Sequence, residues 1–253
     1  MPRRTKIVAT LGPATDAPKV LDELLHAGVD VVRINLSHDT YDAHRQRAET
    51  MRNRAAASGR QLGLLADLQG PKIRIGRFRE HRVSLDDGGE FFLDAGCPLN
   101  AGDRTRVGLT YPDLIRDVTR GDFLLLDDGA IQLRVDQVEN DRVKCKVMVG
   151  GILSNNKGIN KQGGGLSAPA LTQKDRNDIR FAAEIDADYL AVSFVRSADD
   201  VVEARRLLQE AGGRGGLVAK IERAEALECI EEIIDASDAI MVARGDLGVE
   251  IGD

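Results

Sequence analysis

The sequence lacks tryptophan, and aromatic residues make up only 4% of its 253 positions. It also lacks an excess of positive charge, because 35 lysines and arginines face 41 aspartates and glutamates and leave a net charge of −6. A protein whose main partner is nucleic acid needs a basic face or aromatic platforms on which bases stack. The composition therefore argues against nucleic acid as a partner, while local basic clusters for small phosphorylated ligands stay compatible with it.

Cysteine and histidine, the usual ligands of zinc, are scarce. The three cysteines, Cys97, Cys145 and Cys229, have no C-x-x-C spacing, which predicts neither a disulfide framework nor a zinc site. We interpret them as small buried apolar side chains. The four histidines show no triad or metal spacing and are interpreted as structural or solvated, with His38 kept as a possible site neighbour; they are His26, His38, His44 and His81.

Long hydrophobic runs are absent as well. The basic N-terminal segment, residues 1–6, is followed by too short an apolar run for a signal peptide. No run approaches the about 18 apolar residues that a membrane span requires. We expect a globular protein of the cytoplasm with no membrane partner.

Short apolar runs alternate with amphipathic helical patterns over residues 1–70. The patterns predict strands at 7–10, 31–34 and 62–67 and helices at 20–28 and 41–57. Asp39 and Thr40 are candidate caps for the second helix. Because the strands are continuously apolar rather than alternating, they are typical of a parallel sheet covered on both faces.

The hydrophobic period changes to two between residues 71 and 168. Expected strands at 131–135 and 143–147 flank the turn sequence Glu139-Asn140-Asp141, and Lys72–Ile75 alternates in the same way. Glycine and aspartate clusters punctuate the segment, and no helix of ten residues or more is expected there. We predict an all-β domain at 71–168, inserted between two parts of a first domain, 1–70 and 169–253.

The alternation of strands and helices resumes after the glycine-rich segment 161–165. Thr172 and Asp175 form a capping-box pattern for a helix that ends near residue 183. Further strands are predicted at 189–194, 217–221 and 239–243, with helices at 197–211 and 224–235 between them. The series thus has six strands, and it fits either a doubly wound sheet or a (β/α)₈ barrel. Neither G-x-G-x-x-G nor G-x-x-x-x-G-K-[ST] occurs, so an incomplete TIM-type barrel is favoured.

Polar residues interrupt or follow five of the predicted strands, where a barrel places its active site. They are Arg33, Asn35 and Ser37, then Asp67, Ser193, Lys220 with Glu222, and Arg244-Gly245-Asp246. Each has a structural alternative, since Arg33 or Lys220 could pair with a core carboxylate and Asn35 or Ser37 could cap a helix. Burying so many polar groups without a ligand is costly, and the set as a whole therefore favours a functional site.

The residue types in this set point to a chemistry. Glu222 and Asp246 supply the hard oxygen ligands that Mg²⁺ prefers, and they leave positions for water and an anionic substrate. Arg33 and Lys220 are the complementary cations. A metal and two cations around one small anion suit phosphoryl transfer or enolate stabilisation.

Six strings of residues resemble the pyruvate kinase family, and the resemblance covers essentially the whole chain. They are 5–14 (TKIVATLGPA), 32–38 (VRINLSH), 67–74 (DLQGPKIR), 156–160 (NKGIN), 219–222 (AKIE) and 241–250 (MVARGDLGVE). The resemblance implies a catalytic (β/α)₈ barrel interrupted by a mobile β-barrel-like lid. It also implies a Mg²⁺-dependent phosphoryl transfer between phosphoenolpyruvate and ADP that gives pyruvate and ATP in glycolysis.

The resemblance further implies roles for individual residues. Arg33 would hold the transferring phosphoryl group, and Lys220 would stabilise charge in the transition state. Glu222 and Asp246 would bind Mg²⁺, and Gly245 with its neighbouring backbone would contact the substrate carboxylate. The nucleotide-binding residues would be Arg74 and Lys157.

A monovalent-cation site is implied at Asn35, Ser37, Asp67 and the backbone carbonyl of Leu68. In family members that need K⁺ a glutamate occupies the position of Lys72, so lysine resembles the potassium-independent branch. An ammonium group can replace K⁺ as a fixed positive charge. We therefore hypothesise that K⁺ is not strictly required.

The resemblance also predicts strands seven and eight and a C-terminal domain, whereas the sequence stops at residues 251–253, shortly after the sixth strand. We therefore expect a partial chain, inactive by itself if the remaining strands are needed, from a parent protein that forms a homotetramer. Two alternatives stay open. One is a Mg²⁺-dependent aldolase of the related phosphoenolpyruvate/pyruvate barrels, although a lyase has no use for a nucleotide lid. The other is a fragment that binds Mg²⁺ and an organic phosphate without turnover.

Overall fold

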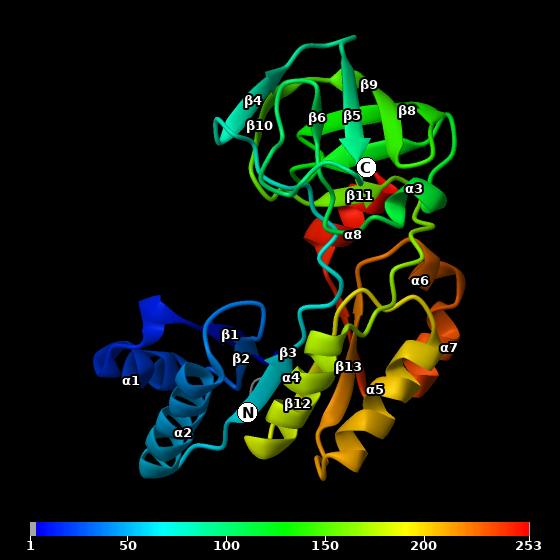
Figure 1. The fold of residues 1–253 in the computed structure, drawn as a ribbon. Coiled ribbons are helices and arrows are strands. Elements are labelled where there is room, and N and C mark those ends of the chain that lie inside the picture. Colours follow the sequence, from blue (N-terminus) through cyan, green and yellow to red (C-terminus); the bar gives the residue numbers. More distant parts are fainter. Residues whose placement is uncertain (1–3, 253) are drawn as a thin grey trace. The chain divides into compact units, whose positions relative to one another are not determined.

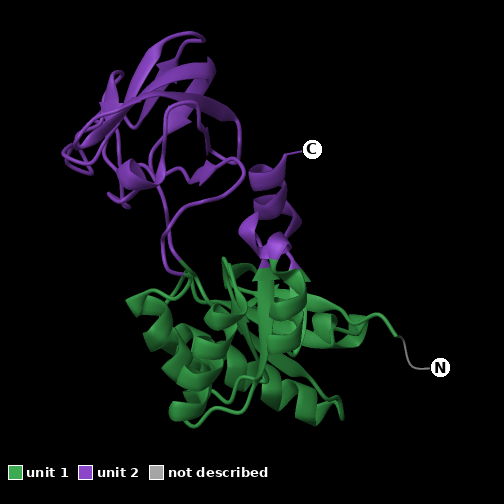
Figure 2. Ribbon diagram, turned by 90° about the vertical axis from the view of Figure 1, so that its right-hand side faces the viewer, with its two compact units in different colours: residues 1–70, 170–220, 229–241 green, residues 71–169, 221–228, 242–253 purple. Residues whose placement is uncertain are grey.

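The computed structural model describes residues 4–252, so the first three residues of the basic N-terminal segment lie outside the described part. The chain divides into two compact units, shown in Figure 2. Unit 1 contains residues 1–70, 170–220 and 229–241, and unit 2 contains residues 71–169, 221–228 and 242–253. Because unit 2 includes two segments outside 71–168, the boundaries of an inserted lid domain stay a prediction. Among residues 4–252, no helix is long and apolar enough to cross a membrane.

Unit 1 is built on a curled six-stranded sheet with helices, which is the half-barrel expected of an incomplete α/β barrel (Figure 1). Its strand order, β1-β2-β3-β12-β13-β14, follows the chain. The strands are β1 (Val8–Leu11), β2 (Val31–Asn35), β3 (Gly63–Asp67), β12 (Tyr189–Val192), β13 (Gly216–Ile221) and β14 (Ala239–Val242). All six predicted strands are confirmed, and the registered neighbours from β1 to β13 pair in parallel.

The helices of unit 1 follow the predicted positions closely. They are α1 (Pro18–Ala27), α2 (Tyr41–Ala57), α4 (Gln173–Glu184), α5 (Ala198–Glu210) and α7 (Ile230–Ala236), with a short 3₁₀ helix at Pro13–Thr15. Thr40 is the cap of α2, since its side chain accepts a hydrogen bond from the backbone of Ala43. The capping box at Thr172 is confirmed as the start of α4.

Two predicted elements differ from the observed ones. The helix expected at 224–235 is broken into α6 (Glu225–Glu228) and α7, because Cys229 leaves the helical conformation and its thiol contacts the backbone oxygen of Arg196 at 3.1 Å. The strand expected at 189–194 ends at Val192, and Phe194 has a positive φ of 55°. Beyond β14 the structure adds α8 (Arg244–Ile251), a helix that the sequence patterns did not predict.

The two faces of the sheet differ because side chains alternate along each strand. On one face of β2, β3, β12 and β13 every side chain is buried, as expected of the side that packs on helices; these are Val32, Ile34, Leu64, Ala66, Leu190, Val192, Leu217, Ala219 and Ile221. The other face carries a small apolar cluster of Leu65, Ala191 and Val218. Above that cluster, toward the carboxyl ends of the strands, the same face becomes polar.

Unit 2 is mostly β-structure. A sheet of order β11-β7-β8-β9-β5-β6 is accompanied by the pair β10-β4. The strands are β4 (Arg82–Leu85), β5 (Glu90–Asp94), β6 (Arg106–Val107), β7 (Phe123–Leu126), β8 (Ile131–Val138), β9 (Arg142–Val149), β10 (Gly151–Ser154) and β11 (Ile159–Lys161). The helix α3 (Leu114–Asp117) has four residues, so no helix of ten residues interrupts the segment, as predicted.

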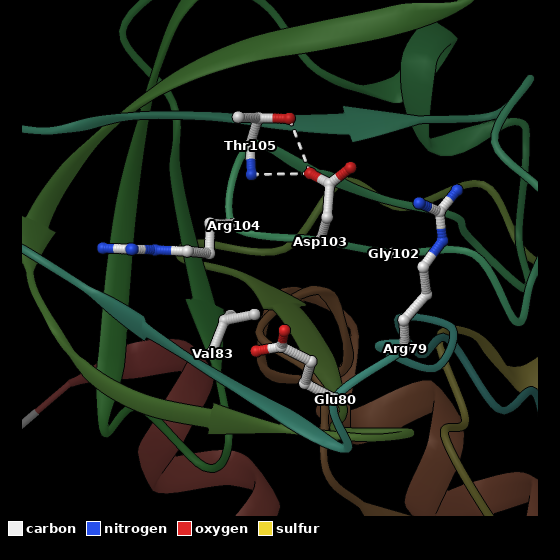
Figure 3. A pocket seen from close by; sticks show the side chains of 7 residues that line it. All are labelled: Arg79, Glu80, Val83, Gly102, Asp103, Arg104 and Thr105. Carbon is white, nitrogen blue, oxygen red and sulfur yellow. Dashed lines mark hydrogen bonds between the residues drawn. The ribbon is translucent and has the colours of Figure 1, made fainter.

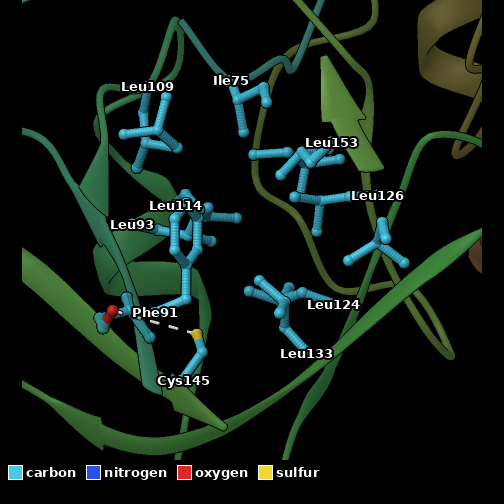
Figure 4. Packing of buried hydrophobic residues seen from close by; sticks show 14 of the residues in the cluster. Ile75, Phe91, Leu93, Leu109, Leu114, Leu124, Leu126, Leu133, Cys145 and Leu153 are labelled. Atoms are coloured by element: carbon cyan, nitrogen blue, oxygen red, sulfur yellow. Dashed lines mark hydrogen bonds between the residues drawn. The ribbon is translucent and has the colours of Figure 1, made fainter. Parts of the chain in front are cut away.

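The core of unit 2 gathers apolar side chains from most of these strands, and Figure 4 shows Phe91, Leu133 and Cys145 among them. The hairpin predicted around residues 139–141 is confirmed as β8 and β9. The alternating segment Lys72–Ile75 forms only isolated bridges, Arg74 with Gly158 and Ile75 with Leu109, rather than a strand. The segment therefore extends neither sheet of unit 2.

Candidate functional site

Asp67 is the centre of a hydrogen-bonded network at the carboxyl end of β3. Its carboxylate accepts from Arg33 Nε at 2.6 Å through one oxygen and lies 3.4 Å from Lys220 Nζ through the other. Asp67 is only 1% exposed, whereas the Arg33 and Lys220 side chains are 26% and 12% exposed. A buried carboxylate is stable only when paired, and here it holds two cations that keep some access to solvent.

The parallel register explains why Lys220 meets Asp67. Asn35 lies opposite Asp67, and Asp67 lies opposite Ala191, which in turn lies opposite Val218. Lys220 follows Val218 by two residues and therefore shares its face.

Two hydroxyl groups complete the network. Ser193 receives a hydrogen bond from Lys220 Nζ at 2.8 Å and donates one to the backbone oxygen of Leu68 at 2.7 Å. Thr10 lies opposite Arg33 in the register of β1 and β2, and its hydroxyl accepts from the guanidinium at 2.9 Å. Asp67 and the two hydroxyls thus fix the directions of the two cationic side chains.

The residues predicted for a monovalent-cation site overlap with this network, because Asp67 and the backbone oxygen of Leu68 belong to both. Asn35 and Asp67 are register partners, and the backbone N–H of Leu36 donates to the backbone oxygen of Asp67 at 3.0 Å. The side-chain oxygen of Asn35 accepts from the backbone N–H of Ser37 at 3.1 Å. The structure therefore brings Asn35, Ser37, Asp67 and Leu68 to one end of neighbouring strands.

The predicted metal ligands belong to unit 2. Glu222 is 2% exposed at the end of β13, while Asp246 is exposed in the first turn of α8, next to Gly245. Among residues 4–252, no group of three or more histidine, cysteine, aspartate or glutamate side chains is arranged to hold a metal. A pair of carboxylates is nevertheless the donor set that suits Mg²⁺, which retains waters and binds substrate oxygens.

Arg74 and Lys157, far apart in sequence, are brought together in unit 2. Arg74 forms a bridge with Gly158, and its guanidinium donates to the backbone oxygen of Asn156 at 3.0 Å. Lys157 pairs with Asp127 at 2.7 Å. Lys72 precedes this pair, and its backbone oxygen accepts from the hydroxyl of Thr110 at 2.8 Å.

A cavity of about 280 Å³ lies elsewhere in unit 2, lined by Arg79, Glu80, Val83, Gly102, Asp103, Arg104 and Thr105 (Figure 3). The carboxylate of Asp103 is held by the backbone and hydroxyl of Thr105, and these bonds lower the pKa of Asp103. The Arg79 and Arg104 side chains extend in different directions in Figure 3. None of the predicted site residues lines this cavity.

Comparison with known proteins decides the family. The chain matches the family described as pyruvate kinase, barrel domain, over residues 2–253. The chain belongs to the pyruvate kinase family. It is 55% identical to pyruvate kinase II of Salmonella typhimurium and 54% identical to the pyruvate kinase of Haemophilus influenzae, each time over 99% of this chain and 53% of the relative. The chain therefore spans about half the length of these curated pyruvate kinases.

Sequence reasoning missed two residues of the arrangement. Thr10 holds Arg33, and its only signal was a polar side chain near the end of an apolar strand. Arg223 is 2% exposed and donates to the backbone oxygen of Leu166 at 3.0 Å. From the sequence alone, an arginine directly after Glu222 is expected at the surface. Its burial depends on the contact with Leu166, 57 positions away.

Proposed function

We propose that this chain carries the phosphoryl-transfer site of a pyruvate kinase, which transfers the phosphoryl group of phosphoenolpyruvate to ADP and gives pyruvate and ATP. The observation that carries the proposal is the network in which Asp67 holds Arg33 and Lys220 side by side. Two cationic side chains with fixed directions at neighbouring strand ends suit an anionic substrate. Membership in the pyruvate kinase family supports the same activity.

Each cation has a distinct task in this proposal. Arg33 uses Nε and one terminal nitrogen for Asp67 and Thr10, and a guanidinium with five N–H donors keeps others for a phosphoryl group. Lys220 is directed by Ser193 and Asp67 and stabilises the negative charge that develops on the enolate oxygen as the phosphoryl group departs. Because both groups are already oriented, little reorganisation is needed during the reaction.

Mg²⁺ would be held by Glu222 and Asp246 and would neutralise phosphate charge. Gly245 lies at the start of α8, where backbone N–H groups have no partner within the helix and can bind the substrate carboxylate. Arg74 and Lys157, adjacent in unit 2, would bind the phosphates of the nucleotide. Asn35, Ser37, Asp67 and Leu68 would form the monovalent-cation site, with Lys72 as the positive charge that replaces K⁺.

The test is pyruvate formation from phosphoenolpyruvate, ADP and Mg²⁺ with the wild-type chain and the Lys220→Met variant. We expect the substitution to lower kcat by at least about a hundredfold, the scale of losing one charge-stabilising group. Lys146→Met, which removes an exposed lysine of unit 2, is the control and should retain activity.

Other outcomes separate the alternatives. Consumption of phosphoenolpyruvate without ADP would favour an aldolase. Calorimetric binding of phosphoenolpyruvate with no product from folded protein would identify a binding fragment. Equal activity of the wild type and Lys220→Met would contradict the role of Lys220.

A further inference from the structure

The turn that follows β2 is held by side chains of two helices, α2 and α4. The backbone oxygen of Leu36 accepts from Lys174 Nζ of α4 at 2.6 Å, and that of His38 accepts from His44 Nε2 of α2 at 2.7 Å. Arg47, also on α2, donates to the carboxylate of Asp39 at 2.6 Å, and Asp39 has a left-handed φ of 61°. Thus three successive parts of one short turn each have a side-chain anchor.

Lys174 is itself fixed in place. It pairs with Asp178, one turn further along α4, at 2.5 Å, and Asp178 is fully buried. The other oxygen of Asp178 accepts from the hydroxyl of Tyr41 at 2.6 Å, and the Tyr41 ring stacks on Phe181 with a centroid distance of 4.5 Å. Asp178 therefore holds the Lys174 ammonium where it donates to the backbone oxygen of Leu36.

His44 is suited to holding the backbone oxygen of His38. It is 3% exposed, and its bond to a carbonyl oxygen requires the proton on Nε2. Its Nδ1 has no hydrogen-bond partner among the residues that the structure describes. Burial lowers the pKa of His44, which favours the neutral ring. A neutral ring with its only proton on Nε2 donates to His38 alone.

We propose that Lys174 and His44 are positioning residues that hold the turn after β2, which carries Ser37 and directly follows Asn35, in the geometry needed for ligand binding. The two anchored carbonyls, those of Leu36 and His38, flank Ser37. The backbone N–H of Ser37 in turn donates to the side-chain oxygen of Asn35. Fixing the backbone on both sides of Ser37 directs its side chain, as partners behind a ligand-binding group do in general. The inference rests on the proposed function in that Asn35 and Ser37 are taken as part of that site.

The test compares Lys174→Met and His44→Leu with the conservative variants Lys174→Arg and His44→Gln, which keep an N–H donor. The control is Arg206→Met, which removes another ion pair between positions four apart on a helix, with Glu210 at 2.5 Å on α5. Amide hydrogen exchange of residues 35–39 measures the turn, and KM and kcat for phosphoenolpyruvate measure the site.

We expect Lys174→Met and His44→Leu to speed exchange in residues 35–39 and to raise KM about tenfold, with a smaller change in kcat. The conservative variants should restore both values, and Arg206→Met should change neither. Unchanged exchange in the turn would overturn the inference. So would faster exchange with unchanged KM, or equal effects of the conservative and apolar variants.

The two proposals fail in different ways. If the wild type forms no pyruvate, the proposed activity fails, and binding of phosphoenolpyruvate with Mg²⁺, measured by calorimetry, replaces KM as the readout. If the wild type also shows no binding, exchange of residues 35–39 alone decides whether Lys174 and His44 hold the turn. A turn that keeps its protection in both apolar variants contradicts the positioning role in every case.

Discussion

Asp67 is the residue that links the two cations of the strand-end network in unit 1. Arg33 and Lys220 are both cations on the same face of a sheet, and without a shared partner they would repel each other. A buried aspartate between them compensates their charges and is itself compensated. Because removing one partner of a buried pair leaves an uncompensated charge, substitutions of these residues affect folding as well as chemistry. When Lys220 is replaced, Asp67 still has Arg33 as a partner. Variants of Lys220 therefore report on the chemistry with the least effect on folding.

The side chain of Lys72 leads to a prediction about the requirement for K⁺. If its ammonium replaces K⁺ as a fixed positive charge, the Lys72→Glu variant should need K⁺ for full activity, whereas the wild type should be indifferent to it. Steady-state rates with and without K⁺, at constant ionic strength set with a large organic cation, measure this requirement.

Lys146→Glu is the matched control, because it makes the same charge change on an exposed lysine of β9 in unit 2. It should not create a need for K⁺. A Lys72→Glu variant that is as indifferent to K⁺ as the wild type would show that Lys72 does not take the place of the cation.

Helix α4 buries an apolar face and also holds backbone segments that follow two strands of unit 1. Its first turn is closed by Thr172 and Asp175, and Asp175 also accepts from the backbone N–H of Gly70 at 3.0 Å. In the same first turn, Lys174 reaches the turn after β2, and Asp178, one turn further along, accepts a hydrogen bond from the Lys174 ammonium. One helix therefore secures the backbone just after β3 as well as the turn after β2.

The capping box of α4 predicts a measurable loss of stability. In Thr172→Ala the hydroxyl that accepts from Asp175 N–H at 3.2 Å is gone, and we expect the free energy of unfolding to fall by about 1 kcal/mol. Urea unfolding followed by circular dichroism provides the measurement. Thr172→Ser keeps the hydroxyl and should lose much less; equal losses in both variants would contradict a capping role.

In unit 2, the glycine-rich segment before Leu166 is likewise held by contacts with residues distant in sequence. The backbone N–H of Gly165 is held by Glu225 at 2.5 Å, and that of Gly163 by the backbone oxygen of Glu250 at 2.9 Å. Burial opposes ionisation of Glu225, but the bond from Gly165 and the nearby Arg223 keep its pKa below the usual value. Gly164 has a left-handed φ of 78°, a conformation that favours glycine. These contacts connect the segment to the residues that follow Glu222.

For the whole molecule, His44 predicts how stability depends on pH. Burial lowers the pKa of His44 in the folded state, with Arg47, Asp39 and Lys174 as the charged groups that face it. Above the unfolded value of about 6.5 both states are neutral and the stability is complete. As the pH falls below that value, the unfolded state binds a proton that the folded state refuses, so stability falls by at most about 1.4 kcal/mol per pH unit.

The measurement is urea unfolding at pH values of about 7.5 and 5.5, on either side of the histidine pKa. The wild type should lose more stability over this interval than His44→Gln, which has no titrating ring. His81→Gln, at a position outside the helices and strands, is the control and should behave like the wild type. A pH dependence that is the same in His44→Gln and in the wild type would contradict this assignment.

Much of the fold and part of the site follow from the sequence alone. The six strands, the capped starts of α2 and α4 and the hairpin of β8 and β9 depend on side-chain periodicity and turn residues, which act over a few positions. The placement of polar residues at strand ends follows from the same periodicity, and strings such as residues 67–74 identify the family.

Only the tertiary structure decided which groups pair. Asp67 takes Arg33 and Lys220 as partners, and Lys174 reaches Leu36 across 138 positions. The burial of Arg223 and the break at Cys229 likewise depend on distant backbone oxygens. Local patterns cannot specify such contacts, because each forms only after sheet and helix packing has brought remote segments together. The sequence alone determined which residues are available for chemistry, and packing determined which of them share a hydrogen bond.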